Sequence, residues 1–176
     1  MKRLLSSFSL LLAGCMGMPE TVTPVQNFEL DQFVGKWYEV ARLDHSFERG
    51  LSEVSAEYSL KKDGSVKVLN SGYKREASKW KSAEGKASFA EAADQGYLKV
   101  SFFGPFYSSY VVFDLGEGYQ HAFVSGASTD YLWLLSRTPD ISPALREQFL
   151  IMAGERGFDT NEVIWVEHGA EGIPAR

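Results

Sequence analysis

The feature that most constrains this sequence is residues 37–137, where strand-like runs follow one another and no helical period interrupts them. Gly35-Lys36-Trp37 stands at the start of this stretch and Arg137 at its end. The turns at 62–65 and 116–118 contain glycine, which readily adopts the positive φ that hairpins require. Sequential strands are therefore expected to pair as antiparallel neighbours and to close into a barrel. Eight runs are predicted, at 37–44, 53–61, 65–73, 80–91, 96–103, 107–115, 119–127 and 131–137.

The two-residue period of a strand predicts which side chains face the inside of this barrel. The second run alternates apolar and polar residues, which is typical of a strand with one buried and one solvated face. An eight-stranded barrel has room for packed side chains or for one small ligand. Small residues in the inner set leave space for a ligand, although the same residues could form an ordinary core. The predicted inner set is Ala56, Tyr58, Val66, Val68, Leu98, Val100, Tyr110, Val112, Tyr131, Trp133 and Leu135.

One helix and one short strand are expected after the barrel. Ser142 can cap a helix that has Pro143 in its first turn. Leu145, Phe149, Met152 and Ala153 then form an apolar stripe that is predicted to lie on the outer wall of the barrel. The run at 163–166 is predicted to be an edge strand. The expected fold is thus all-β, an eight-stranded antiparallel up-and-down barrel with one C-terminal α-helix and a short ninth strand.

The first residues have the layout of an export signal. Basic residues precede an apolar stretch that is too short to span a bilayer. Leu12-Ala13-Gly14-Cys15 resembles the bacterial lipobox, which implies that residues 1–14 are removed and that Cys15 carries acyl chains such as palmitate. Met16 is not the aspartate that favours inner-membrane retention, so we expect an anchor in the outer membrane that faces the periplasm. The expected organisation is a signal peptide at 1–14, a tether at 15–27, a barrel domain at 28–170 and a tail at 171–176.

Charge and cysteine content narrow the possible partners. Loss of Lys2 and Arg3 with the signal peptide lowers the formal net charge from −5 to −7. So acidic a domain is not expected to bind nucleic acid. Cys15 is the only cysteine, so no internal disulfide is possible.

The order of these elements resembles the lipocalin family across residues 28–167. The runs Phe47–Gly50, Phe102–Phe106 and Tyr131–Arg137 resemble in particular its branch of bacterial outer-membrane lipoproteins. The resemblance implies that Trp37 lies at the closed base of the barrel and that Arg137 packs over it. Gly35 belongs to the same family motif. The family also has a Thr-Asp-Tyr element at the base of the barrel, between strands six and seven, and only Asp114 matches it there. The identical triplet Thr129-Asp130-Tyr131 lies between strands seven and eight instead, at the open end.

The resemblance and the apolar inner set together predict a protein that binds fatty acids, phospholipids or lysophospholipids for storage, transport or envelope maintenance. Ten buried methylenes contribute about 8 kcal/mol before ordering and association costs are subtracted. Lys74, Arg75 and Lys79 are expected at the open end, where a basic rim could attract anionic head groups. A solvated charged turn is the alternative for these three residues.

Two other classes of function are compatible with this sequence. One is an envelope-associated adaptor whose barrel is filled by its own side chains, and the other is a lipocalin-fold enzyme. No histidine pair has metal-ligand spacing and no nucleophile motif occurs, so we expect no metal, no cofactor and no catalysis. Glu39 lies two residues after Trp37 in the same strand and is therefore expected to point inward. A buried carboxylate is costly there unless an arginine, a tyrosine or water donates a hydrogen bond to it. A homodimer is possible.

Overall fold

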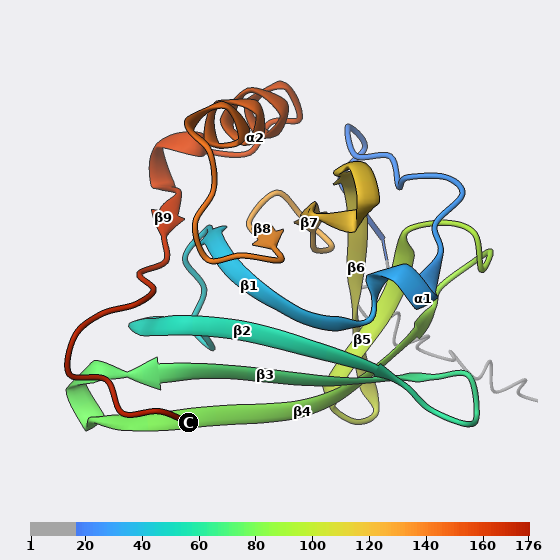
Figure 1. Ribbon diagram of the computed structural model, residues 1–176. Helices are drawn as coiled ribbons and strands as arrows, with labels where there is room; N and C mark the ends of the chain where they lie inside the picture. Colours follow the sequence, from blue (N-terminus) through green and yellow to red (C-terminus); the bar gives the residue numbers. More distant parts are fainter. Residues whose placement is uncertain (1–16) are drawn as a thin grey trace, which may run out of the picture.

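A computed structural model describes residues 17–176. Antiparallel strands form one nine-stranded sheet in the order β2-β3-β4-β5-β6-β7-β8-β1-β9, and β2 also pairs with β1, which closes the barrel (Figure 1). The predicted eight-stranded barrel with a helix and a ninth strand is therefore confirmed. The elements are α1 (Leu30–Phe33), β1 (Gly35–Arg42), β2 (Leu51–Leu60), β3 (Val66–Lys74), η1 (Arg75–Ala77), β4 (Lys79–Phe89), β5 (Tyr97–Phe103), β6 (Phe106–Leu115), η2 (Glu117–Tyr119), β7 (His121–Ser125), β8 (Leu132–Ser136), α2 (Pro143–Glu155), η3 (Thr160–Glu162) and β9 (Ile164–Trp165).

β1 is the strand that closes the barrel. Its first half pairs with β2 and places Trp37 opposite Ala56, whereas its second half pairs with β8 and places Arg42 opposite Trp133. A β-bulge interrupts the β1–β8 register between Glu39 and Ala41. Such a bulge inserts one extra residue and so shifts the inside–outside alternation of the strand.

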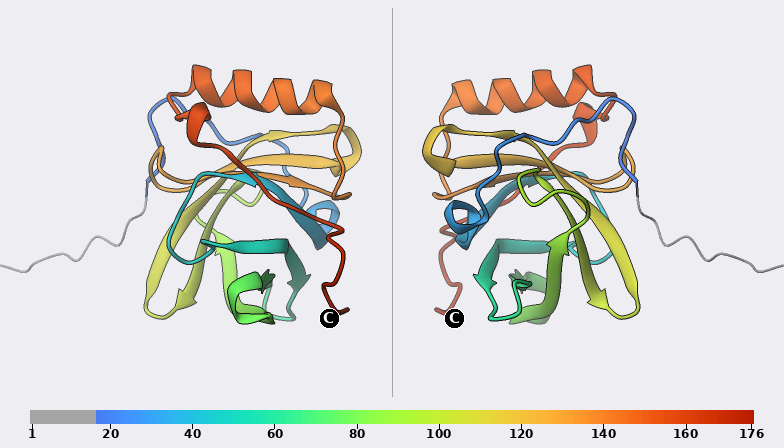
Figure 2. Two further views of the ribbon diagram at one scale, coloured as in Figure 1. Left: turned by 90° about the vertical axis from the view of Figure 1, so that its left-hand side faces the viewer. Right: turned by 90° about the vertical axis from the view of Figure 1, so that its right-hand side faces the viewer.

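α2 covers the outer wall of the barrel, as predicted. Ser142 caps it by accepting a hydrogen bond from the Leu145 amide at 3.2 Å, and Pro143 occupies its first turn. Figure 2 shows α2 lying along the outside of the sheet rather than across either end. Phe149 and Ala153 are fully buried in a core that they share with outward-facing residues of β1 and of β6 to β8.

The base of the barrel is closed by α1 and by an arginine. The Arg137 guanidinium lies 3.8 Å from the centroid of the Trp37 ring, a cation–π contact. It also donates to the carbonyls of Gln32 at 2.7 Å and of Lys36 at 2.9 Å, which joins the end of α1 to β8. Gly35 has a φ of +97°, and a Cβ there would lie 3.5 Å from the guanidinium. The expected packing of Arg137 over Trp37 is thus present.

Asp114 also lies at the base, where β6 ends. Its carboxylate lies 3.1 Å from Nε2 of His121 on β7. This contact joins the two strands that flank the 116–120 turn.

The two ends of the described chain pack against the sheet. In the expected tether at 15–27, the Val25 amide donates to the Val112 carbonyl at 2.9 Å and Val22 is buried. At the other end, the Trp80 indole donates to the Pro174 carbonyl at 2.9 Å. Within residues 17–176, no helix has the length and apolarity needed to cross a bilayer. The boundaries of the signal peptide, tether, domain and tail stay predictions.

Candidate functional site

The lower part of the barrel interior is a buried apolar core. Thirteen buried residues form it, and they come from α1 and from all eight barrel strands or the segments beside them. Phe33 is central, with ring centroids 4.9 Å from Trp37 and 5.3 Å from Tyr58. The members are Phe28, Phe33, Trp37, Ala56, Tyr58, Val66, Val68, Ala87, Leu98, Val112, Ala122, Val124 and Leu135.

Above this core, inward-facing side chains become accessible. Val100, Tyr110 and Trp133 pack against the core yet are only partly buried. Solvent therefore reaches these inner side chains in part, from the end of the barrel away from the base. The Tyr58 and Tyr110 hydroxyls lie 2.9 Å apart, and burial raises the pKa of both phenols, so this pair stays neutral.

The structure brings the predicted inner residues together. Ten of the eleven belong to this one interior, either in its buried core or packed against it. Tyr131 lies just before β8, at the open end, with its ring centroid 6.2 Å from that of Trp133. Whether these residues contact a ligand stays a prediction.

A buried ion pair lies on one wall of the upper interior. The β1 bulge turns Val40 and Ala41 toward α2, and Glu39 and Arg42 toward the inside. Arg42 Nη1 lies 2.7 Å from the Glu39 carboxylate, and the two side chains are 2% and 5% exposed. The expected inward orientation of Glu39 is confirmed, and Arg42 is its partner.

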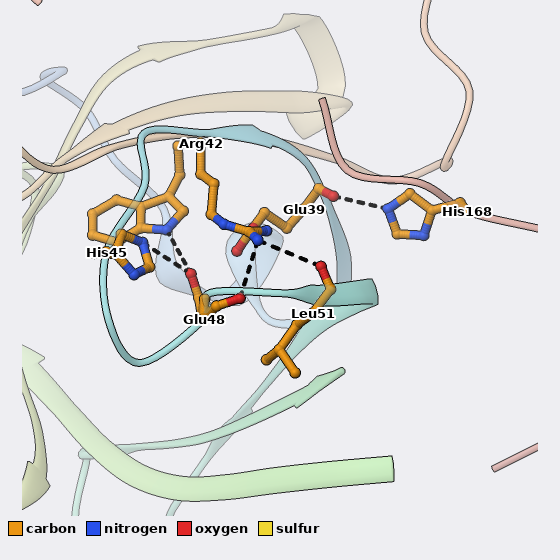
Figure 3. Close-up of polar contacts among 7 residues, drawn as sticks. Glu39, Arg42, His45, Glu48, Leu51 and His168 are labelled. Atoms are coloured by element: carbon orange, nitrogen blue, oxygen red, sulfur yellow. Dashed lines mark hydrogen bonds and ion pairs between the residues drawn. The ribbon is translucent and has the colours of Figure 1, made fainter. Parts of the chain in front are cut away.

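The segment between β1 and β2 folds over this ion pair (Figure 3). Arg42 Nη2 donates to the Glu48 carbonyl at 3.0 Å, which fastens the segment to the strand below. The Glu48 carboxylate accepts from the Trp133 indole at 3.2 Å and lies 3.0 Å from His45 Nε2. Glu48 and His45 are thus buried side chains of this segment, whereas Phe47 is 62% exposed.

The two buried carboxylates have opposite pKa shifts. Burial raises the pKa of Glu39 well above its usual value, and the nearby charge of Glu48 raises it further. Burial acts in the same direction on Glu48, but the close contact with His45, the hydrogen bond from the Trp133 indole and the charge of Arg42 together outweigh it and hold the pKa of Glu48 below its usual value. The upper interior therefore combines apolar, aromatic and charged groups.

The predicted rim is present at the open end, but two of its cations have partners. Lys74 Nζ lies 3.2 Å from the Glu76 carboxylate, and Arg75 pairs with Glu167 at 2.8 Å. Lys79 is exposed. The net positive charge of this rim is therefore smaller than the sequence indicates, and its role in binding head groups stays a prediction.

Beyond several apolar core residues, sequence reasoning missed three polar residues of the interior. In an uninterrupted strand the two-residue period that turns Trp37 and Glu39 inward would turn Arg42 outward. Only the bulge places Arg42 inside, and the sequence does not reveal it. Glu48 lies outside any strand, and no period applies to it. Asn70 shares the inward parity of Val66 and Val68 and was detectable, and its side-chain oxygen is buried without a partner in the described structure.

Comparison with known proteins agrees with this architecture. The family model of the lipocalin-like domain matches residues 28–168. The chain is 62% identical over 160 residues to outer membrane lipoprotein Blc of Vibrio cholerae, covering 90% of this chain and 94% of that protein. It is 50% identical over 149 residues to outer membrane lipoprotein Blc of Escherichia coli K12, covering 85% and 84% of the two chains.

Among solved structures, insecticyanin from Manduca sexta superposes with a TM-score of 0.70 at 21% identity and covers 89% of each chain, which is a likeness of fold. The closed barrel, the arginine over the base tryptophan and these relatives lead to one conclusion. The chain belongs to the lipocalin family, in its branch of bacterial lipoproteins anchored in the outer membrane.

Proposed function

We propose that this protein carries fatty acids, phospholipids or lysophospholipids in its barrel, for lipid storage, transport or maintenance of the envelope. The observation that carries the proposal is the gradient along the interior, from a buried apolar core at the base to partly exposed aromatic side chains and a buried ion pair toward the open end. A hydrocarbon tail would lie in the apolar part and its polar head near the mouth.

The energetics are adequate for a carrier. Each buried methylene contributes about 0.8 kcal/mol, so an acyl chain of about 15 methylenes contributes about 12 kcal/mol, which leaves roughly micromolar affinity after an association cost of about 4 kcal/mol. The partly exposed Tyr110 hydroxyl supplies a neutral polar contact for a head group, and the Glu39–Arg42 ion pair is buried and adds no net charge to the site. Such a site tolerates several head groups, which fits a carrier better than a catalyst. We accordingly assign no catalytic role to the barrel.

The lipid anchor belongs to the same proposal. Acylation of Cys15 with more than one acyl chain would hold the carrier at the outer membrane, because a single chain gives only weak and reversible attachment. Mass analysis of the N-terminal peptide tests this directly. Acyl chains on Cys15 support the proposal, and an unmodified thiol or a mature chain that starts elsewhere contradicts it.

The lumen assignment is tested by filling it. Val100→Trp places a large ring on the partly buried inner wall, and Glu57→Trp places the same ring on the exposed outer face. Displacement of two or three methylenes of ligand should weaken binding of a fluorescent fatty acid by about 10- to 100-fold. The outer variant should bind like the parent protein. Equal affinities in both variants would remove the lumen as the site.

The filled-barrel adaptor is the competing hypothesis. It predicts that the parent protein takes up no fatty acid at any concentration and that Val100→Trp changes nothing. Uptake by the parent protein that is lost in the filled variant separates the two.

A further inference from the structure

The β5–β6 hairpin presents an apolar tip that the carrier function leaves unexplained. Phe103 and Phe106 are cross-strand partners and are 80% and 70% exposed, the two most exposed large apolar side chains among the described residues. The hairpin projects away from α2 in both views (Figures 1 and 2). Exposed aromatic pairs of this kind mark contact with a protein or with a lipid surface.

The charge around this tip is positive, although the whole chain is acidic. Lys86 and Lys99 lie 5.4 and 5.7 Å from the Tyr107 ring, next to Phe106. A groove of about 380 Å³ runs beside the hairpin. Its lining contains three lysines and one carboxylate, and is made by Lys61, Lys67, Glu84, Gly85, Lys86, Ser101, Phe102 and Gly104. Since Glu84 pairs with Lys67 at 2.9 Å, Lys61 and Lys86 leave the groove with net positive charge.

The described part of the chain begins on this side of the barrel. The Gly17 amide donates to Ser109 Oγ on β6 at 3.0 Å. Gly17 lies two residues after Cys15, and two extended residues span at most about 7 Å. Ser109 lies three residues beyond Phe106 on the same strand, or about 10 Å. An acylated Cys15 would therefore bring lipid within reach of the tip.

From these observations we propose that the β5–β6 hairpin docks on the lipid surface in which the protein is anchored. Phe103 and Phe106 enter the interfacial region, and Lys86, Lys99 and the lysines of the groove face anionic head groups. The proposal rests on the acylation of Cys15 and not on the identity of the carried lipid. It gives the anchored barrel one fixed orientation, with the open end beside the bilayer.

Site-specific labelling tests this docking in the full-length lipidated protein. The acylated cysteine is the only native one, so Phe106→Cys and Ile151→Cys each introduce a single reactive thiol. Ile151 is a matched control, because it is an exposed apolar residue on α2 and is 54% exposed. The protein is reconstituted in vesicles of phosphatidylethanolamine and phosphatidylglycerol. A fluorophore at position 106 should be quenched by nitroxide-labelled lipid, and one at position 151 should not.

Charge reversal probes the second part of the surface. Each lysine near an anionic membrane raises the membrane-binding constant by about fivefold. Lys86→Glu combined with Lys99→Glu should therefore reduce the docked fraction, measured as quenching at position 106. Lys36→Glu, at the base of the barrel, should leave it unchanged.

Two results would overturn the proposal. Equal quenching at positions 106 and 151 would show that the hairpin does not contact lipid. A label at 106 that is shielded from water but not quenched by labelled lipid would show that a second copy of the chain covers the tip. Fatty-acid binding is measured on the same samples in a separate assay. The carrier proposal and the docking proposal can therefore fail independently.

Discussion

Replacing Arg42 with methionine should destabilise the protein more than any exposed substitution. Arg42 is 2% exposed, pairs with the Glu39 carboxylate at 2.7 Å and donates to the Glu48 carbonyl at 3.0 Å. Methionine fills a similar volume but leaves the carboxylate buried without a countercharge. Loss of one partner from a buried ion pair costs about 3–5 kcal/mol. For a domain of this size we expect Tm to fall by about 6–20 °C.

The size of this loss should depend on pH, and the sign follows from Glu39. Its folded-state pKa is already raised by burial, and removal of Arg42 raises it further. A carboxyl with a raised folded pKa stabilises the fold below its unfolded pKa of about 4.3 and loses that contribution as pH rises through the folded value. The destabilisation by Arg42→Met should therefore be larger at about pH 8 than at about pH 5.

Urea unfolding followed by circular dichroism measures both effects. Arg146→Met is the matched control, since Arg146 stacks on the Trp165 ring at 3.9 Å on the exposed side of α2 and should cost less than about 1 kcal/mol. The double variant Arg42→Met/Glu39→Leu removes both charges and should recover most of the loss. An Arg42→Met protein as stable as the parent, or a double variant no better than the single one, would refute the assignment of a buried ion pair.

Three further changes have defined outcomes. Glu48→Gln should lower the free energy of unfolding near neutral pH. The difference in this free energy from the parent protein should shrink as pH falls below about 4.3, because the folded pKa of Glu48 lies below its usual value. A difference that is constant with pH would contradict this. Arg137→Ala should cost about 2–3 kcal/mol in urea unfolding through loss of its charged hydrogen bonds, with partial recovery in Arg137→Lys; an unchanged midpoint for Arg137→Ala would refute its role at the base. Lys74→Gln with Arg75→Gln should weaken binding of anionic lipids more than of neutral ones in equilibrium titrations, and equal effects would exclude the basic rim.

The barrel could be predicted from the sequence because its signals are local. Alternation along each run sets which residues face inward, and glycine-containing turns set antiparallel neighbours. The same alternation correctly grouped residues as distant as Ala56 and Leu135 in one interior. Strand ends were less certain, and Tyr119, predicted to begin a strand, instead ends a 3₁₀ turn with a φ of +58°.

The polar part of the interior depends on long-range geometry that no local period encodes. The bulge in β1 is a property of its pairing with β8, and it alone turns Arg42 inward. Arg75 is neutralised by Glu167, which approaches only because the C-terminal segment returns along the sheet. Lys74 and Glu76 are close in sequence, yet their pairing also depends on the turn that joins β3 to β4.

The carrier hypothesis is tested most directly by weighing the intact protein with whatever it retains. Native mass spectrometry of protein gently extracted from its own membrane should show one fatty acid or lysophospholipid per barrel for the parent chain and for Glu57→Trp. Val100→Trp should retain much less, in line with an affinity that is about 10- to 100-fold weaker. An empty parent barrel that also takes up no lipid when offered it, or a filled variant that keeps its lipid, would contradict the account.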